Sequence, residues 1–274
     1  MTPSGKINNL ILNRMNVRLL LCAVALSFPL SAQTQLVNLR HWSGQGISPA
    51  YEGYDTNEDG SFNMWFGYMN RNYEETPDIP VGPDNNFSPG PADRGQPTHF
   101  LARRHKDVFS VRVPKDFVGQ TLTWTVKANG DTQKVVASLG PQWMIDRKWT
   151  TRGANIENPY SNLPPVVTVP GPQLVSASEP LTLAISATDD GRPVRQGKPI
   201  GLTFAWGMYR GPGKVTFDPV EQKMADGKGT TTARFSAPGE YILQVVVDDG
   251  SGENAGNFGY HCCWTNAQVK VTVK

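Results

Sequence analysis

Apolar and polar residues alternate along several stretches of the chain, at the two-residue period that turns one face of a β-strand toward a core. In the N-terminal half, such rows cover residues 62–68, 109–113 and 122–126. Between the first two rows lies the proline-rich stretch 76–97, which predicts a long surface loop because proline cannot donate to a sheet. We expect a β-sandwich over residues 33–146, which resembles no family.

The C-terminal half contains a more regular set of rows, after a Pro-rich linker at 147–163. The rows lie near residues 173–176, 181–187, 202–208, 215–217, 233–235, 241–247 and 269–273. Seven short strands, with Trp206 facing inward on the third and Tyr241 opening the sixth, are the pattern of an immunoglobulin-like sandwich. The predicted fold is therefore all-β, with two sandwiches, the second over 164–274.

Four segments of this second region also carry a family resemblance. They are Ala-Thr-Asp-Asp-Gly at 187–191, Leu-Thr-Phe-Ala-Trp at 202–206, Gly-Pro-Gly-Lys-Val-Thr-Phe at 211–217 and the strand that opens Pro-Gly-Glu-Tyr at 238–241. Together they resemble the polycystic-kidney-disease (PKD) type of domain, in its receptor-for-egg-jelly-like branch. The resemblance covers residues 164–274 and implies an extracellular module used in adhesion or spacing, or attached to a secreted enzyme, without catalysis.

The N-terminus is typical of a secretory signal peptide. Arg14 and Arg18 precede an apolar run at 19–30, and small residues follow at 31–32. No later run is long enough to cross a bilayer. We therefore expect residues 1–32 to be removed, and the mature chain to be secreted or periplasmic without a transmembrane segment.

Composition narrows the function classes further. The chain of 274 residues holds 27 glycines and 22 prolines, which disfavours long helices, and its net charge of +2 is spread along the sequence. Nucleic acid is excluded as a partner, since binding it requires concentrated Lys and Arg. No Gly-x-Ser-x-Gly, His-Glu-x-x-His or phosphate-loop motif occurs, which favours a non-enzyme, although 24 acidic residues leave a carboxylate pair open.

Cleavage of the leader leaves two adjacent cysteines, Cys262 and Cys263, in an oxidising compartment. We expect them to be bonded to each other, as a clamp or a redox switch. With His261 beside them, a soft metal is a second interpretation. A third is that they are buried as small apolar residues or in a structural disulfide.

Two acidic pairs, Asp189–Asp190 and Asp248–Asp249, follow the second and sixth predicted strands of the second sandwich. Both strand ends lie at one pole in this topology, so four carboxylates predict a calcium site, the one cofactor considered. The alternative is that each pair begins a turn at the glycine that follows it. A weaker calcium-like motif at 55–60 is better explained as a β-hairpin turn.

The loops after those two strands, 189–201 and 250–266, are long and rich in functional side chains. They give a candidate binding surface of Arg192, Arg195, Phe258, Tyr260, His261 and Trp264. Long loops on a rigid scaffold commonly carry function, so we expect this pole to be the working surface and to face the first sandwich. The cationic stretch 99–106 is either a site for an acidic polysaccharide or carboxylate, or a solvated strand edge.

These features favour an exported, non-catalytic binding or adhesion protein whose partner is a protein or polysaccharide at the cell surface. One alternative is a carbohydrate-binding accessory of a secreted enzyme system. Its aromatic candidates are Trp65, Tyr68, Tyr73 and Trp149. The other alternative is a thiol/disulfide or metal-binding protein that uses Cys262 and Cys263.

The leader generates the first test. We expect the exported protein to begin at or near Gln33, because the basic, apolar and small segments occur in the order that signal peptidase reads. Intact-mass measurement on the exported protein checks this. A mass that still includes residues 19–30, or a diacylglycerol on Cys22, would contradict it.

Overall fold

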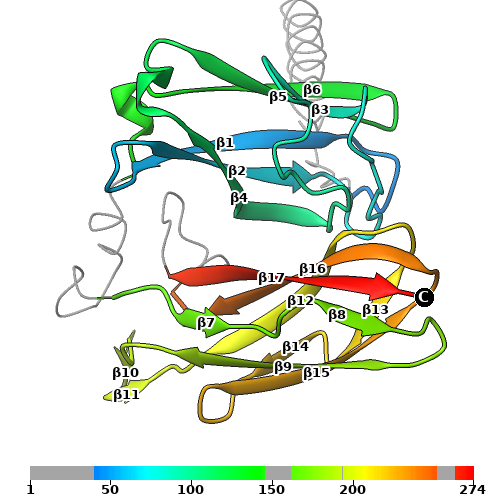
Figure 1. The fold of residues 1–274 in the computed structure, drawn as a ribbon. Helices are drawn as coiled ribbons and strands as arrows, with labels where there is room; N and C mark the ends of the chain where they lie inside the picture. The colour runs from blue at the N-terminus through cyan, green and yellow to red at the C-terminus, as the bar shows by residue number, and fades with distance from the viewer. Residues whose placement is uncertain (1–39, 146–161, 193, 252–262) are drawn as a thin grey trace, which may run out of the picture. The chain divides into compact units, whose positions relative to one another are not determined.

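The protein is all-β in a computed structural model that describes residues 40–145, 162–192, 194–251 and 263–274. Residues Arg40–Lys274 form one compact unit. Within it the strands build two sandwiches, as the alternating rows predict (Figure 1). The expected leader and nearly all of the expected linker lie outside the described residues.

The first sandwich consists of two three-stranded antiparallel sheets, ordered β1-β2-β4 and β3-β5-β6. Its elements are β1 (Ile47–Thr56), β2 (Phe62–Asn70), β3 (Asn85–Ser88), β4 (Arg103–Val113), the short 3₁₀ turn η1 (Lys115–Phe117), β5 (Thr121–Ala128), β6 (Asp131–Ser138) and η2 (Pro141–Trp143). The three predicted rows are β2, β4 and β5, and the β-sandwich expected here is confirmed.

An aromatic cluster fills the space between these two sheets. Phe66 and Phe109 come from one sheet, Phe87 and Trp124 from the other, and Trp124 is fully buried. Phe66 stacks on Phe109 with ring centroids 5.5 Å apart, and Phe87 stacks on Trp124 at 5.7 Å. Burying rings of this size supplies most of the driving force for a small sandwich.

The motif at 55–60 is the turn of the β1–β2 hairpin, as predicted. The amide of Asn57 donates to the carbonyl of Ser61 and that of Gly60 to the carbonyl of Asn57. Asp59 accepts from the backbone amide and hydroxyl of Ser61, and forms an ion pair with Arg112 on β4. These bonds lower the pKa of Asp59, the Ser61 hydroxyl contributing most.

The stretch 76–97 is only partly the surface loop that its prolines predict. Residues Asn85–Ser88 form β3, which pairs with β5, and Phe87 is a core residue. The alternation of apolar and polar residues does not predict β3, because the polar residue Asn85 occupies a buried position in it. Its side chain is satisfied there by backbone carbonyls and by Trp124, so a polar residue costs little at this point.

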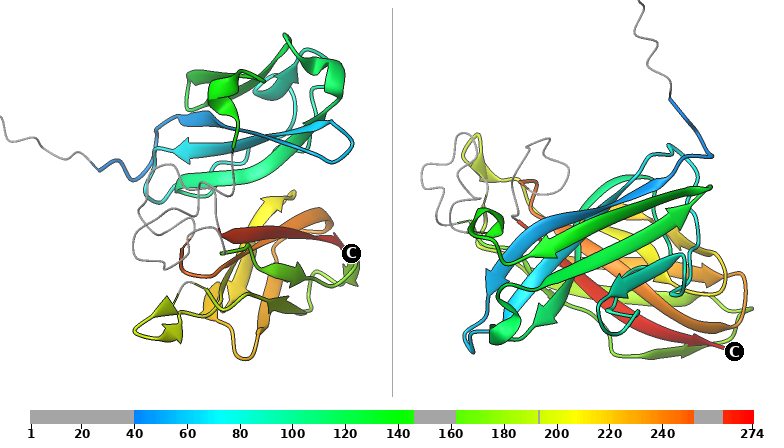
Figure 2. Two further views of the ribbon diagram at one scale, coloured as in Figure 1. Left: turned by 90° about the vertical axis from the view of Figure 1, so that its left-hand side faces the viewer. Right: turned by 90° about the horizontal axis from the view of Figure 1, so that it is seen from above.

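The second sandwich places a five-stranded sheet, β14-β12-β16-β17-β8, against a four-stranded sheet, β13-β15-β9-β7 (Figures 1 and 2). Its strands are β7 (Val166–Thr168), β8 (Gln173–Val175), β9 (Leu181–Thr188), β10 (Val194–Arg195), β11 (Lys198–Pro199), β12 (Thr203–Arg210), β13 (Val215–Asp218), β14 (Glu221–Lys223), β15 (Lys228–Phe235), β16 (Gly239–Asp248) and β17 (Trp264–Val273). All seven predicted rows fall on strands. The two-stranded hairpin β10–β11 lies in the loop after β9.

Two aromatic residues of the second sandwich identify its fold class. Trp206 on β12 is buried in the core and stacks on Phe217, with ring centroids 6.0 Å apart. Tyr241, near the start of β16, donates its hydroxyl to the carbonyl of Ala237 at 2.7 Å. That bond is the tyrosine corner of immunoglobulin-like domains. The second sandwich is immunoglobulin-like.

The tyrosine corner generates a stability prediction. Tyr241→Phe removes the hydroxyl but keeps the ring, so the carbonyl of Ala237 loses its donor, and we expect the free energy of unfolding to fall by about 1–2 kcal/mol. Urea denaturation measures this, with Tyr73→Phe as control because the Tyr73 ring is exposed. Equal unfolding midpoints for the two variants would contradict the role assigned to Tyr241.

Candidate functional site: the joint between the two sandwiches

Tyr209 belongs to the second sandwich by sequence but to the core of the first by packing. The pairing of β12 with β16 shifts register between Met208 and Arg210, so Tyr209 is the extra residue of a β-bulge. Its side chain is 4% exposed, and its hydroxyl donates to the carbonyl of Gly95. Burial raises the pKa of Tyr209, which therefore stays protonated and able to donate.

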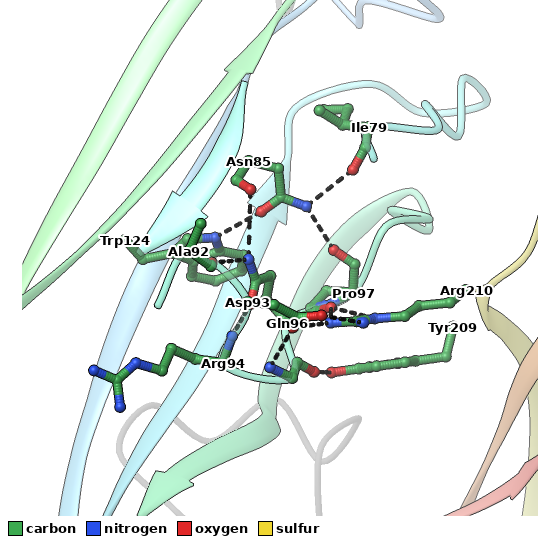
Figure 3. Close-up of polar contacts among 11 residues, drawn as sticks. Ile79, Asn85, Ala92, Asp93, Arg94, Gln96, Pro97, Trp124, Tyr209 and Arg210 are labelled. Atoms are coloured by element: carbon green, nitrogen blue, oxygen red, sulfur yellow. Dashed lines mark hydrogen bonds and ion pairs between the residues drawn. The ribbon is translucent and has the colours of Figure 1, made fainter. Parts of the chain in front are cut away.

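Arg210 extends this contact with four polar bonds to the same loop. Its guanidinium donates to both carboxylate oxygens of Asp93, at 3.0 and 2.8 Å, and from two nitrogens to the carbonyl of Gln96 (Figure 3). The hydrogen bond from Arg210 lowers the pKa of Asp93, although burial opposes it. In return, the bond to Asp93 raises the pKa of Arg210. Arg210 and Asp93 form a bidentate pair, the geometry that makes such bonds strong and directional.

The loop that receives Tyr209 and Arg210 is held in place from within the first sandwich. The side chain of Asn85 donates to the carbonyls of Ile79 and Pro97, at 2.9 and 2.8 Å, and accepts from the indole of Trp124 at 3.0 Å. The fully buried side chain of Gln96 donates to Ala92 at 2.8 Å, and its oxygen accepts from the amide of Arg94 (Figure 3). The carbonyl of Pro97 and the side chain of Gln96 are thus fixed by bonds within the first sandwich.

A second set of contacts joins β4 to the outer face of β16 and β17. Asn266 donates to the carbonyl of Asp107 at 2.7 Å, and Gln244 to that of Val108 at 3.5 Å. These carbonyls project from an irregular part of β4, where residues 106–108 oppose Gly67 alone. We refer to the contacts of Tyr209, Arg210, Gln244 and Asn266 with the first sandwich as the joint.

Gly67 permits this irregularity. A Cβ atom there would collide with the carbonyl oxygen of His105, with the carboxylate of Glu52 and with the guanidinium of Arg104. Arg104 lies across this position, paired with Glu52 at 2.6 Å and bonded to the carbonyl of His105. Only glycine leaves room for a charged pair over the sheet at this point.

Two hollows flank the joint, and Val108 and Asn266 line both. The first has a volume of about 420 Å³ and is lined by Leu101, Arg104, Lys106, Ala205, Gly207 and Val246, among others. The second, of about 590 Å³, is lined by Asp55, Trp65, Ser110, Trp264, Asn266 and Gln268, among others. Part of the cationic stretch 99–106 therefore borders the first hollow, and its residues 103–106 lie on β4, an edge strand of the sheet β1-β2-β4.

The four aspartates predicted as a calcium site each form a local turn. Asp189, Asp190, Asp248 and Asp249 accept from the amides two residues ahead, at Gly191, Arg192, Gly250 and Ser251. These are the bonds of the turn interpretation. In the described part of the chain, no group of three or more His, Cys, Asp and Glu residues is arranged to hold a metal. Calcium binding stays a prediction.

Asp249 stands apart from the other three because it is fully buried. Burial raises its pKa to about 6, against the opposing effect of the bonds that it accepts from Ser251. Burial likewise raises the pKa of Asp189. In both residues burial favours the protonated carboxyl group over the charged carboxylate.

The described part of the predicted binding surface is mostly packed rather than displayed. Trp264 is 7% exposed and Cys263 is fully buried. Cys263 is disulfide-bonded, and its partner lies outside the described residues, as do Phe258, Tyr260, His261, Cys262 and the side chain of Arg195. The pairing of Cys262 with Cys263 and its structural or redox role stay predictions. Arg192 is half-buried and donates its amide to Asp190.

In the described residues, the polar contacts with the first sandwich come from the flat face of β12, β16 and β17, and they include Asn266 at the end of the predicted loop 250–266. Residues 252–262 of that loop lie outside the described residues, so its role at this surface stays a prediction. Of the predicted surface residues, Trp264 borders the second hollow. The sequence pattern does not indicate Tyr209 and Arg210, because a polar residue on the outer face of a strand normally faces solvent. The bulge that exposes Tyr209 carries no local sequence signal.

Comparisons with known proteins identify no family. No family model and no curated protein matches the chain. Among solved structures, the D00–D0 domain of intimin is 9% identical with a TM-score of 0.29, over 83% of this chain and 99% of that one. The titin domains z1z2 in complex with telethonin are 9% identical with a TM-score of 0.24, over 85% and 98%.

A third structure matches a smaller share of the chain. WR4, an MSP family member from C. elegans, is 17% identical with a TM-score of 0.29, over 41% of this chain and 99% of that one. Likenesses this distant carry no argument about function. Separately, none of the helices in the described ranges has the length and apolar character of a membrane span.

The joint generates a prediction about cooperativity. Tyr209→Ala empties a buried site in the first sandwich, so we expect a loss of about 3–5 kcal/mol, with the two sandwiches unfolding in separate transitions. Differential scanning calorimetry checks both effects. The exposed ring of Tyr73 provides the control, since Tyr73→Ala should change stability by less than about 1 kcal/mol. A single, unshifted transition in Tyr209→Ala would show that the joint does not couple the sandwiches.

Proposed function

We propose that the protein is an exported, non-catalytic binding module in which two β-sandwiches act as one rigid unit at the cell surface. The observation that carries this is the joint. A tyrosine from one sandwich is buried in the core of the other, and a bidentate Arg210–Asp93 pair lies beside it. Such a joint fixes the spacing between surfaces on the two sandwiches, which a flexible linker would not do.

The finer assignment of the second sandwich is the PKD type, in its receptor-for-egg-jelly-like branch. The motif segments at 187–191 and 238–241 support it, since they lie at the end of β9 and at the start of β16. This type implies a spacing or adhesion role. It agrees with export through an N-terminal signal peptide and with a protein or polysaccharide partner outside the cell.

Rigid spacing favours binding because it lowers the ordering cost on association. Each side chain or segment that must be immobilised on binding costs free energy, and a preformed arrangement has met that cost in folding. The joint fixes the two whole sandwiches relative to each other before binding, so their ordering does not add to the free-energy cost of association. A protein that touches an extended surface polymer at two points gains most from it.

The experiment measures retention of the full exported chain on washed cells of the producing strain. We expect the wild-type protein to sediment with the cells and Tyr209→Ala to bind roughly tenfold more weakly, corresponding to about 1.4 kcal/mol of ordering cost. Tyr241→Phe serves as the control for lost stability, because it lies outside the joint. A wild-type protein that stays wholly in the supernatant would overturn the proposal.

A further inference from the structure

An exposed aromatic pair lies on the first sandwich. Trp42 is 55% exposed and Tyr73 is 37% exposed, although large aromatic side chains are usually buried. The two rings meet edge to face, with centroids 6.0 Å apart. Neither belongs to a hydrophobic core cluster of the described residues.

The pair is held in place despite its exposure. The amide of Tyr73 donates to the carbonyl of His41, and the amides of Glu74 and Glu75 donate to the carbonyl of Trp42, at 2.9–3.1 Å. The carboxylate of Glu75 accepts from the amide of Gly44 at 2.6 Å. These bonds fix the backbone under both rings, so the rings form a preorganised platform and not a loose end.

Two guanidinium groups converge on this platform. The Cζ atom of Arg103 lies 4.0 Å from the centroid of the Tyr73 ring, and that of Arg40 lies 5.6 Å from it. Arg103 adopts a positive φ of 74°, and its guanidinium donates to the carbonyl of Arg71. The chain thus accepts an unfavourable backbone conformation at the residue that places a cation over the ring.

Neither Arg40 nor Arg103 forms an ion pair with a carboxylate among the described residues. Arg71, Arg104 and Arg112 of the same sandwich do, with Asp131, Glu52 and Asp59. The nearby carboxylate of Glu75 is already bonded to Gly44 and Asn129. Two cations that share one aromatic ring without a counter-ion leave a position for an external anion.

We propose that Trp42, Tyr73, Arg40 and Arg103 form a binding site for an acidic polysaccharide of the uronate type. This inference rests on the proposed binding function and names its ligand class. A sugar presents an apolar C–H face that packs on an aromatic ring, and its hydroxyls stay in water. A uronate adds one carboxylate to each ring, and guanidinium groups bind carboxylates with two parallel hydrogen bonds. The site needs an apolar sugar face and a carboxylate in one ligand. Neutral glucans lack the carboxylate, and acidic peptides lack the sugar face.

Isothermal titration calorimetry of the full exported chain tests the ligand class. The probes are a galacturonate oligosaccharide, a glucose oligosaccharide of equal length and a glutamate peptide of equal charge. We expect the galacturonate oligosaccharide to bind at least about tenfold more tightly than either other probe, and its affinity to fall with added salt. Equal binding of the glucose oligosaccharide or the glutamate peptide overturns the class, and no binding of the galacturonate oligosaccharide overturns the site.

Variants locate the site. Trp42→Ala and Arg103→Gln should each weaken galacturonate binding by about tenfold, and Arg103→Gln should also reduce its salt dependence. The matched controls are Trp143→Ala, whose ring is 39% exposed elsewhere, and Arg112→Gln, whose partner is Asp59. Both should bind like wild type. Unchanged binding in Trp42→Ala and Arg103→Gln, or equal losses in the controls, overturns the placement.

Two further measurements keep the test decisive. Where Trp42→Ala fails to fold, Trp42→Phe keeps a ring, and the ligand-induced change in tryptophan fluorescence should be absent from it; a full change there places the site elsewhere. Retention on washed cells separates the two proposals. A wild-type chain that is retained on cells but ignores the galacturonate oligosaccharide overturns the uronate site alone, whereas loss of retention overturns the binding function.

Discussion

A phenol hydroxyl and a guanidinium leave water at little cost only where acceptors are already aimed at them, and this constraint governs how the two sandwiches are coupled. The acceptors are the backbone carbonyls of Gly95 and Gln96, together with the carboxylate of Asp93. Their positions depend on Gln96 and Asn85, and Asn85 is bonded to Trp124 in the core. The acceptors at the joint are therefore linked through hydrogen bonds to the aromatic core of the first sandwich, which holds them in place.

The strands that could be predicted from sequence are those whose inward residues are regularly apolar. In β16, Tyr241, Leu243, Val245 and Val247 are all buried, so the pattern is unbroken. β1 was missed because its register shifts between Tyr51 and Gly53, which moves the buried positions from odd to even numbers. A local pattern does not reveal a bulge, since bulges are set by the partner strand.

The candidate sites show a similar division. The tyrosine corner and the 55–60 hairpin could be predicted because each depends on residues a few positions apart. The joint could not, because the Tyr209 and Gly95 that it brings together lie 114 residues apart in the chain. Trp42 was missed because an isolated aromatic residue near a terminus has no periodic neighbours. Arg103 and Tyr73 are 30 positions apart in the chain, and only folding brings the Arg103 guanidinium over the Tyr73 ring, next to Trp42.

The edge of the second sandwich has a mechanical consequence. β17 pairs with β8 in parallel, with Val271 opposite Gln173 and Val273 opposite Val175, and the amide of Lys274 donates to the carbonyl of Val175. A tensile load that draws two parallel neighbours apart along their length strains all the hydrogen bonds between them together. In an antiparallel hairpin pulled at its open end, the bonds break one after another. A sandwich built this way resists a shearing force that acts between β8 and β17.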